Sequence, residues 1–268
     1  MHPIEQLRYV ARAGGADGRL LVEEAAGALR IFGDDPAGLL TACKRLLTRQ
    51  PTVGPLWWLC TRILLSGDPR AEGRSVVAEL RSDGTSRNLG HCLPDGAKIG
   101  FNGWPDVVVE ALSKRGDCSA LIVDVDGLGG SVVRRLGRCD VEAEAVDGAR
   151  MAGLVAEVEV IVLEAGVCGP SAALVDVGGL ALAATARVVG RPVWLVAPIG
   201  TYLPEQYWQE IVERAGASDQ PAFLFQHEII GLGLVDRVIR HDHEVSGGQL
   251  LAAAPDCSVA AELLVPAR

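Results

Sequence analysis

The sequence predicts an α/β protein in which an N-terminal helical lobe is followed by a Rossmann-like parallel sheet domain. The segment 158–198 carries most of this prediction. Two apolar runs, 158–164 and 192–198, are joined by a Gly/Pro/Ser-rich loop and an Ala/Leu-rich helical run at 178–189. Apolar runs without polar alternation suit strands buried on both faces, and two such strands connected through a helix are parallel. Hydrophobic residues make up 49% of the chain and aromatic residues only 4%, which fits an interior of Val, Leu and Ala.

The first part of the chain, from residue 4 to about residue 65, has apolar residues at helical spacing. One helix is expected at 20–32, and Asp34, Asp35 and Pro36 are expected to form the cap of a second helix, with the proline in its first turn. The segment 81–97 is polar and rich in glycine, so we expect a loop there.

This loop lies near the predicted domain boundary. The N-terminal helical lobe is assigned to residues 1–90 and the Rossmann-like domain to residues 91–268.

Beyond residue 97 the pattern alternates between strand and helix. Strands are expected at 98–101, 120–124, 141–146, 222–225 and 234–239, and helices at 105–114, 130–136, 148–157 and 202–215. Strands that alternate with helices at this spacing indicate right-handed crossovers and one parallel sheet. Ligands bind such sheets at the carboxyl ends of the strands, so a site is expected within 164–176.

Composition narrows the classes of function. The net charge of -9 argues against a nucleic-acid surface, and no apolar run is long enough to span a membrane. Seven scattered cysteines without a CxxC pair indicate reduced thiols in a cytoplasmic protein. The five histidines lack the spacing of metal ligands, and we expect neither a metal nor a cofactor.

Three stretches resemble the translation initiation factor 2B alpha/beta/delta family, which also contains the methylthioribose-1-phosphate and ribose-1,5-bisphosphate isomerases. They are RAGGADGRLLVEEAAGAL at 12–29, RQPTVGPLWWL at 49–59 and GGLALAATARVVGRPVWLVAP at 178–198. The resemblance implies the two-part fold described above and a homodimer formed through the sheet domain.

The residues that carry the isomerase reaction of this family are not retained. Its proton-handling Cys falls on Asn102 and its Asp on Gly166, and neither replacement can exchange a proton. The phosphate-holding Asn-Lys of the family falls on Val175 and Asp176, and the Arg of its Arg-Pro-Thr turn falls on Gln50. We therefore expect the isomerase reaction to be lost.

The favoured function is a non-isomerase, small-ligand-binding or regulatory protein, and the expected partner is a small phosphorylated ligand. The ligand-binding residues expected in the cleft are Arg49, Gln50, Asn102, Gly103, Trp104 and Ser171. The alternative is an enzyme with rewired residues, similar to an aldose–ketose sugar-phosphate isomerase, with Cys168, Asp176 and Glu164 as catalytic candidates. For Cys168, the role of a small buried filler competes with this one.

Two weaker motifs are also present. The glycine-rich turn at 127–130, followed by Asp147, partly matches a dinucleotide fingerprint, but Val132 stands where the third glycine belongs. A tight turn without a ligand is favoured. His91 and Cys92 form a possible base and nucleophile pair, for which an ordinary loop is the favoured alternative.

Overall fold

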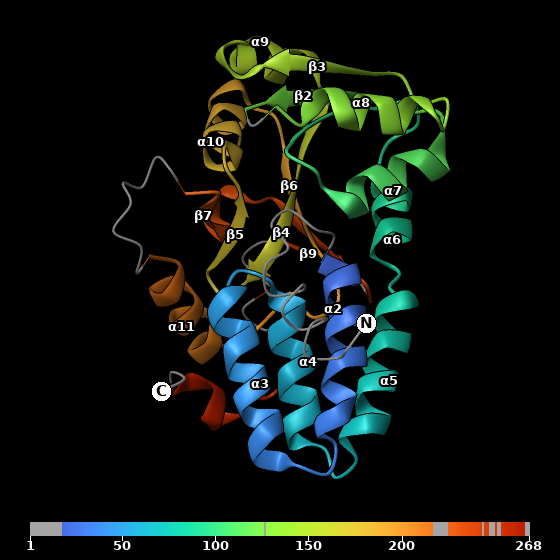
Figure 1. Ribbon diagram of the computed structural model, residues 1–268. Coiled ribbons are helices and arrows are strands. Elements are labelled where there is room, and N and C mark those ends of the chain that lie inside the picture. Colours follow the sequence, from blue (N-terminus) through green and yellow to red (C-terminus); the bar gives the residue numbers. More distant parts are fainter. Residues whose placement is uncertain are drawn as a thin grey trace.

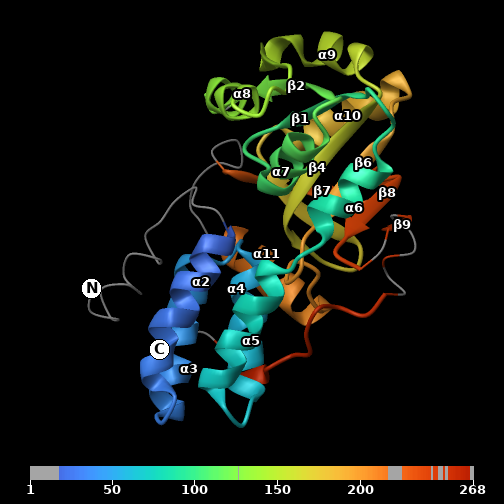
Figure 2. The ribbon, with the colours of Figure 1, turned by 90° about the vertical axis from the view of Figure 1, so that its right-hand side faces the viewer.

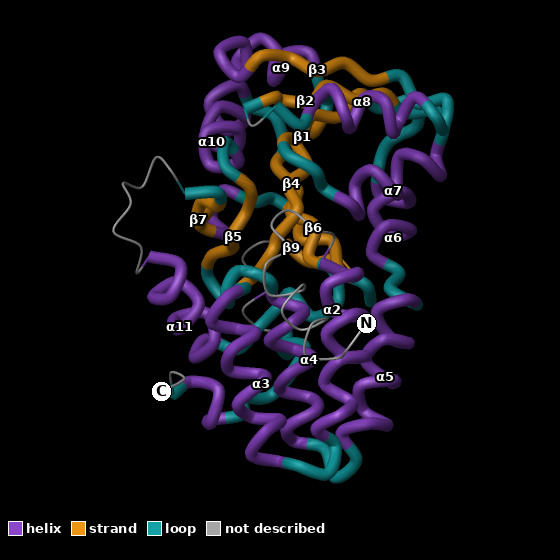
Figure 3. Tube along the Cα trace, in the orientation of Figure 1, coloured by secondary structure: helices purple, strands orange, loops and turns teal. Residues whose placement is uncertain are grey.

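The computed structural model describes residues 18–125, 127–216, 225–242, 244–246, 250 and 253–265. These residues form a helical lobe, lower in Figure 1, and an α/β region above it that is built on one main sheet. Figure 3 shows the strands gathered above this lobe. The fold class predicted from the sequence is confirmed. The helical pattern expected before residue 18 lies outside the described residues.

Two helices of the helical lobe are capped by aspartate side chains. Its helices are α2 (Gly18–Leu29), α3 (Pro36–Arg49), α4 (Gly54–Leu65) and α5 (Pro69–Arg81), with a 3-10 turn at Arg30–Phe32. The Asp35 side chain accepts the backbone N–H of Gly38, and Pro36 lies in the first turn, as predicted. Asp68 caps α5 in the same way, and an aspartate at this position satisfies N–H groups that have no partner within the helix.

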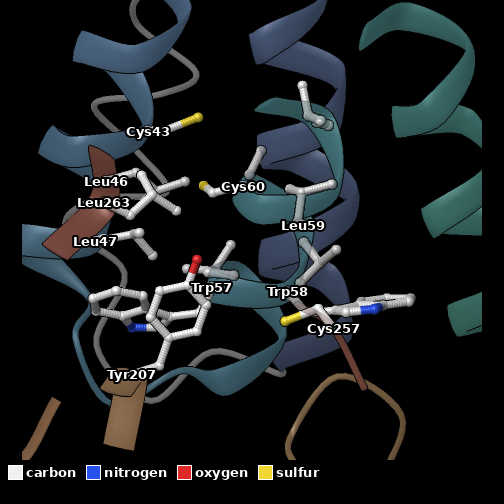
Figure 4. Close-up of a cluster of buried hydrophobic side chains, with 14 of the residues drawn as sticks. Cys43, Leu46, Leu47, Trp57, Trp58, Leu59, Cys60, Tyr207, Cys257 and Leu263 are labelled. Atoms are coloured by element: carbon white, nitrogen blue, oxygen red, sulfur yellow. The ribbon is translucent and has the colours of Figure 1, made fainter. Parts of the chain in front are cut away.

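Helix α4 lies at the centre of the lobe. Trp57 and Trp58 are fully enclosed, and the Tyr207 ring lies 5.0 Å from the Trp57 ring. Tyr207 comes from α11 (Glu205–Gly216), which belongs to the second half of the chain (Figure 4). Its hydroxyl lies 2.7 Å from Oγ1 of Thr61 and accepts the backbone N–H of Ala260. The C-terminal segment and α11 therefore close the core of the N-terminal lobe.

The main sheet is mostly parallel. Its parallel strands are β1 (Lys98–Asn102), β2 (Ser119–Asp124), β3 (Ala143–Asp147), β4 (Val160–Cys168), β6 (Val193–Ala197) and β8 (Arg237–Arg240). They lie in the order β3-β2-β1-β4-β6-β8, and β9 (Glu244–Ser246) pairs antiparallel with β8 at the edge. The strands predicted between residues 98 and 198 are present with slightly shifted ends, and the parallel pairing of β4 with β6 is confirmed.

Helices cover both faces of this sheet (Figure 2). They are α6 (Thr85–Cys92), α7 (Asp106–Arg115), α8 (Gly129–Gly137), α9 (Met151–Glu157) and α10 (Gly179–Val189). Along β4, Ile161 and Leu163 pack with α9 and α10, while Val160 and Val162 pack with α6, α7 and α8. Because successive side chains point to opposite faces, both faces need apolar residues, which explains the continuous apolar run in the sequence.

The expected loop at the end of β4 is instead a hairpin. Strand β4 continues to Cys168 and pairs antiparallel with β5 (Ala172–Asp176), which pairs in turn with β7 (His227–Gly231). The register shifts between Ala165 and Val167, so Gly166 lies at an irregularity in the ladder. The hairpin places Asp176 beside Glu164 and Ala165, within β4, and Gly/Pro/Ser residues form only the turn.

Two further expectations need revision. The segment 81–97, expected to be a loop, contains helix α6, so His91 and Cys92 end a helix. The Cys92 thiol donates to Glu244, and burial and that carboxylate raise the pKa of Cys92 to about 11. The division between residues 90 and 91 stays a prediction; helix α6 spans these positions, and its Leu89 packs in a core cluster with strands of the main sheet. The strand expected at 222–225 lies outside the described residues except for Phe225.

Candidate functional site

The candidate site lies where the turn after α3 meets the ends of β1 and β5 and the middle of β4. Two glycines bring the lobes together there. A Cβ atom on Gly54 would lie 2.8 Å from the carbonyl oxygen of Gly166, and one on Gly166 would lie 3.1 Å from the carbonyl oxygen of Thr52. Side chains at these positions would force the lobes apart, so the close approach depends on glycine.

Asn102 and Gly103, at the end of β1, line this junction. The buried Asn102 amide donates to the carbonyl oxygens of Val177, at 2.9 Å, and Asp176, at 3.4 Å. Gly103 has a φ of +67°, and a Cβ there would collide with Oδ2 of Asp176. The predicted ligand residues Asn102 and Gly103 therefore meet the predicted catalytic residue Asp176, and the amide of Asn102 holds the backbone around it.

Glu164 brings a second carboxylate to the same place. Its Oε2 atom accepts the backbone N–H of Val107 at 2.8 Å, at the start of α7. Burial and the negative charges of Asp106 and Asp176 raise the pKa of Glu164 to about 8, against the lowering effect of the backbone hydrogen bonds. At neutral pH the Glu164 carboxyl is mostly protonated, and it can act as a proton donor.

His227, which was not singled out from the sequence, completes the cluster. Its Nδ1 atom lies 3.6 Å from Oδ1 of Asp176, and its Nε2 atom lies 3.2 Å from Oγ1 of Thr52. His227 and Asp176 are register partners across β5 and β7. Because this pairing joins segments about fifty positions apart, no local motif could have indicated His227.

We call the residues at this junction the inter-lobe cluster: Thr52, Asn102, Gly103, Asp106, Glu164, Asp176 and His227. General acid–base catalysis needs a side chain that can gain or lose a proton, and a neighbouring carboxylate can orient that side chain. Among the described residues, no group of three or more His, Cys, Asp or Glu side chains is arranged to hold a metal ion. The negative charges of Asp106 and Asp176 make the cluster acidic, while burial and these charges raise the pKa of Glu164.

Cys168 does not join the inter-lobe cluster. Its side chain is fully buried, and its thiol is directed to the carbonyl oxygen of Gly169. Burial raises the pKa of the Cys168 thiol to about 12, so it carries a proton at neutral pH. A buried thiol of high pKa is a poor nucleophile, and this environment favours the packing role over the catalytic one.

The other predicted ligand residues are dispersed. Ser171 lies exposed in the turn before β5, at the end of that strand opposite Asp176. Arg49 is an exposed residue at the end of α3, and Gln50 follows it as the C-cap. The half-buried Trp104 donates its indole N–H to Oδ1 of Asp106 at 2.9 Å, which fixes its ring near the cluster.

Two aspartate side chains already accept backbone N–H groups at or near the glycine-rich turn before α8. Oδ1 of Asp124 accepts the backbone N–H of Gly129, at the helix start where a phosphate would bind. Asp147 accepts the backbone N–H of Ala149. These contacts favour a turn without a ligand over dinucleotide binding. Asp126 lies outside the described residues.

None of the helices in the described ranges combines the length and the apolar character of a membrane span.

The α/β fold of this chain is similar to that of initiation factor 2B subunits, as comparison with solved structures shows. The translation initiation factor eIF-2B of Pyrococcus horikoshii OT3 matches with a TM-score of 0.77 at 13% identity, over 91% of this chain and 96% of that one. The eIF2B beta subunit of Chaetomium thermophilum matches with a TM-score of 0.74 at 15% identity, over 92% and 89%.

An enzyme shares the same fold. The 5-methylthioribose 1-phosphate isomerase of Pyrococcus horikoshii OT3 matches with a TM-score of 0.69 at 16% identity, over 93% of this chain and 86% of that one. No family model and no curated protein sequence matches the chain. These matches confirm the fold that the sequence resemblance implied. The fold is shared by the initiation factor subunits and by the isomerase.

Proposed function

We propose that this protein is a non-isomerase with the initiation factor 2B-like fold, a small-ligand-binding or regulatory protein. In this proposal the junction between the lobes is a ligand site whose ancestral proton chemistry has been lost. The proposal rests on the side chains at the positions that the sequence resemblance assigns to proton transfer and phosphate binding.

The proposal rests on Asn102 and Gly166, because neither residue has a side chain that can transfer a proton. Interconversion of an aldose and a ketose needs one group that removes a carbon-bound proton and another that protonates or polarises the oxygen. The Asn102 amide cannot take a proton at neutral pH, and it is already engaged with two backbone carbonyls. Gly166 has no side chain, and its backbone is packed against the turn at Thr52.

The charge of the inter-lobe cluster supports the same proposal. Asp176 stands where the resemblance places a phosphate-binding Lys, and the negative charges of Asp106 and Asp176 already raise the pKa of Glu164. A phosphoryl group placed here would meet further repulsion. We therefore rank a neutral, hydroxyl-rich ligand above the phosphorylated ligand expected from the sequence.

Two measurements on the purified protein test this proposal. Incubation with aldose 1-phosphates, followed by NMR, is expected to yield no ketose. A thermal-shift screen should compare ribose with ribose phosphates and nucleoside monophosphates, and we expect stabilisation by the uncharged sugar to exceed that by the phosphates. Loss of the shift in Asp176→Ala would place the ligand at the cluster. Formation of a ketose product would refute the proposal.

A second candidate function is an enzyme with rewired residues. It is favoured by the pKa of about 8 at Glu164 and by the position of His227 between Asp176 and Thr52. In that case Glu164→Gln and His227→Gln would each abolish turnover, while Cys168→Ala would retain it.

The homodimer and the cytoplasmic location expected from the sequence stay predictions. Light scattering of the purified protein measures the first directly.

A further inference from the structure

A cavity of about 250 Å³ lies away from the inter-lobe cluster, between the helical lobe and the ends of β6 and β8. Helices α4 and α5 provide one wall, and the C-terminal segment provides another. The lining residues are Trp58, Arg62, Glu79, Ile199, Arg240, His241, Asp242, Ala254, Pro255 and Asp256. This set shares no residue with the inter-lobe cluster.

Arg240 is the most unusual residue of this cavity, because it is charged yet only 4% exposed. Its Nη2 atom donates to Oδ1 of Asp256 at 3.0 Å, and its Nε atom lies 3.4 Å from Oδ1 of Asp242. The guanidinium group also lies over the Tyr202 ring, 5.0 Å from its centre. These contacts hold the guanidinium plane in one orientation at the cavity wall.

Two nitrogens of Arg240, Nε and Nη1, are buried and have no hydrogen-bond partner among the described residues. The same holds for Nδ1 of the neighbouring His241, which lies 4.0 Å from Oδ1 of Asp242. Leaving a buried donor unpaired costs about 1–3 kcal/mol, and more for a charged group. Both residues line the cavity, so an acceptor atom bound there would relieve both costs.

The other charges of the cavity restrict which acceptor can bind. Arg62 is held by Glu79 and Glu72, and Oδ2 of Asp256 accepts two backbone N–H groups. The cavity wall therefore has two arginines and three acidic residues. A multiply charged anion would be repelled, whereas a ligand that carries a cation as well can face the carboxylates.

Two of these carboxylates are accessible. The side chain of Glu79 is 38% exposed and that of Asp242 is 45% exposed. A carboxylate has about four acceptor positions, so each of these groups can receive an ammonium proton in addition to its present contacts. The cavity thus offers donors at its buried end and acceptors at its accessible side.

We propose that this cavity binds a small zwitterion of the size of an α-amino acid. Its carboxylate accepts hydrogen bonds from Nη1 of Arg240 and Nδ1 of His241, and its ammonium group faces Glu79 and Asp242. The volume fits this class, since 250 Å³ holds about eight waters at about 30 Å³ each and lies below the roughly 300–1,000 Å³ of drug-sized pockets. Because helices and sheet both contribute walls, a bound molecule would link the two parts of the chain.

The first test is a thermal-shift screen of the full chain with each of the twenty common α-amino acids, followed by calorimetric titration of those that stabilise it. Each stabilising amino acid is compared with the amine that lacks its carboxylate, the acid that lacks its amino group, and inorganic phosphate. We expect at least one amino acid to bind ten times more tightly than all three. Absence of amino-acid binding, or equally tight binding of the amine, the acid or phosphate, would overturn the proposal.

The second test uses variants that keep the buried Arg240–Asp256 pair intact. Asp242→Asn is expected to weaken amino-acid binding at least tenfold, because it removes the charge that faces the ammonium group. The matched control is Arg237→Gln, five positions earlier on β8, a half-exposed residue that pairs with Glu244 and does not line the cavity. Unchanged affinity in Asp242→Asn, or an equal loss in Arg237→Gln, would contradict the assignment.

Discussion

The Nδ1 atom of His227 lies 3.6 Å from Oδ1 of Asp176, across the antiparallel pair of β5 and β7. The other side of the same ring faces Oγ1 of Thr52 in the turn between α3 and α4. A side chain of the sheet region and one of the helical lobe are thereby joined through a single imidazole. The position of Asp176 is set by this contact and by the absence of a side chain at Gly103.

The contact between Thr52 and His227 should contribute to the stability of the lobe junction. Thr52→Val keeps the shape of the side chain and removes the hydroxyl, so we expect a loss of about 0.5–1.5 kcal/mol in unfolding free energy. Denaturant titration measures this. Thr48→Val is the matched control, because the exposed Thr48 hydroxyl only contacts the Lys44 carbonyl within its own helix. Equal losses in the two variants would contradict the assigned contact.

Gly103→Ala should destabilise the protein by at least about 2 kcal/mol, since it adds a collision with Asp176 to the cost of a positive φ. Gly116→Ala separates the two costs. Gly116 has a φ of +73°, and no atom of the described residues lies within 4 Å of the place that its Cβ would take. We expect Gly116→Ala to lose only about 1 kcal/mol. If denaturant titration gives the same loss for both variants, the proximity of Asp176 to Gly103 is wrong.

The raised pKa of Glu164 predicts a pH dependence of stability. Its pKa rises from 4.5 to about 8 in the folded protein, so between these values the unfolded chain releases a proton that the folded chain keeps. Stability from this group therefore falls as pH increases from 4.5 to 8 and is constant above that range. At about 1.4 kcal/mol per pKa unit, and with partial exposure of the side chain, we expect Glu164→Gln to be more stable than the wild type at pH 8.5 by about 1–3 kcal/mol.

Thermal unfolding of the wild type and Glu164→Gln from pH 5 to pH 9 measures this difference. The two proteins should unfold at similar temperatures near pH 5, where both side chains are neutral, and should separate as the pH rises. Parallel curves over the whole range would show that Glu164 titrates normally.

The thiols should differ in reactivity. Cys168 is buried and burial raises its pKa to about 12, whereas Cys139 is exposed. Treatment of the native protein with iodoacetamide at pH 8, followed by mass spectrometry of peptides, should modify Cys139 and leave Cys168 unmodified until denaturant is added. Rapid modification of native Cys168 would restore it as a catalytic candidate.

Much of the fold could be predicted because its signals are local. The buried runs at β4 and β6, the caps of α3 and the alternation of strands and helices follow from residue order and spacing. The β4–β5 hairpin was not predicted, because its Gly169-Pro170-Ser171 turn is equally typical of a loop and its pairing depends on β7, far along the chain. Helix α6 was missed because its sequence is polar and begins at Thr85 without a strong apolar period.

The candidate site was only partly predictable, because some of its residues meet through pairing between distant segments. Asn102 and Gly103 lie at the end of β1, Asp176 ends β5, and Glu164 is the last residue of β4 that pairs with β6, so the parallel sheet gathers these residues into one place. His227 reaches the cluster through strand pairing, and Cys168 leaves it because β4 runs on past Glu164 into a buried position. Neither outcome is encoded in spacing alone.

We propose that this chain shares the fold of a sugar-phosphate isomerase and lacks its proton-transfer groups. The most direct measurement is NMR of aldose 1-phosphates incubated with the purified protein at high enzyme concentration. The account predicts that the aldose signals stay unchanged and that no deuterium from the solvent enters the carbon next to the carbonyl. A ketose signal that grows with protein concentration, and that is lost in Glu164→Gln or His227→Gln, would contradict it.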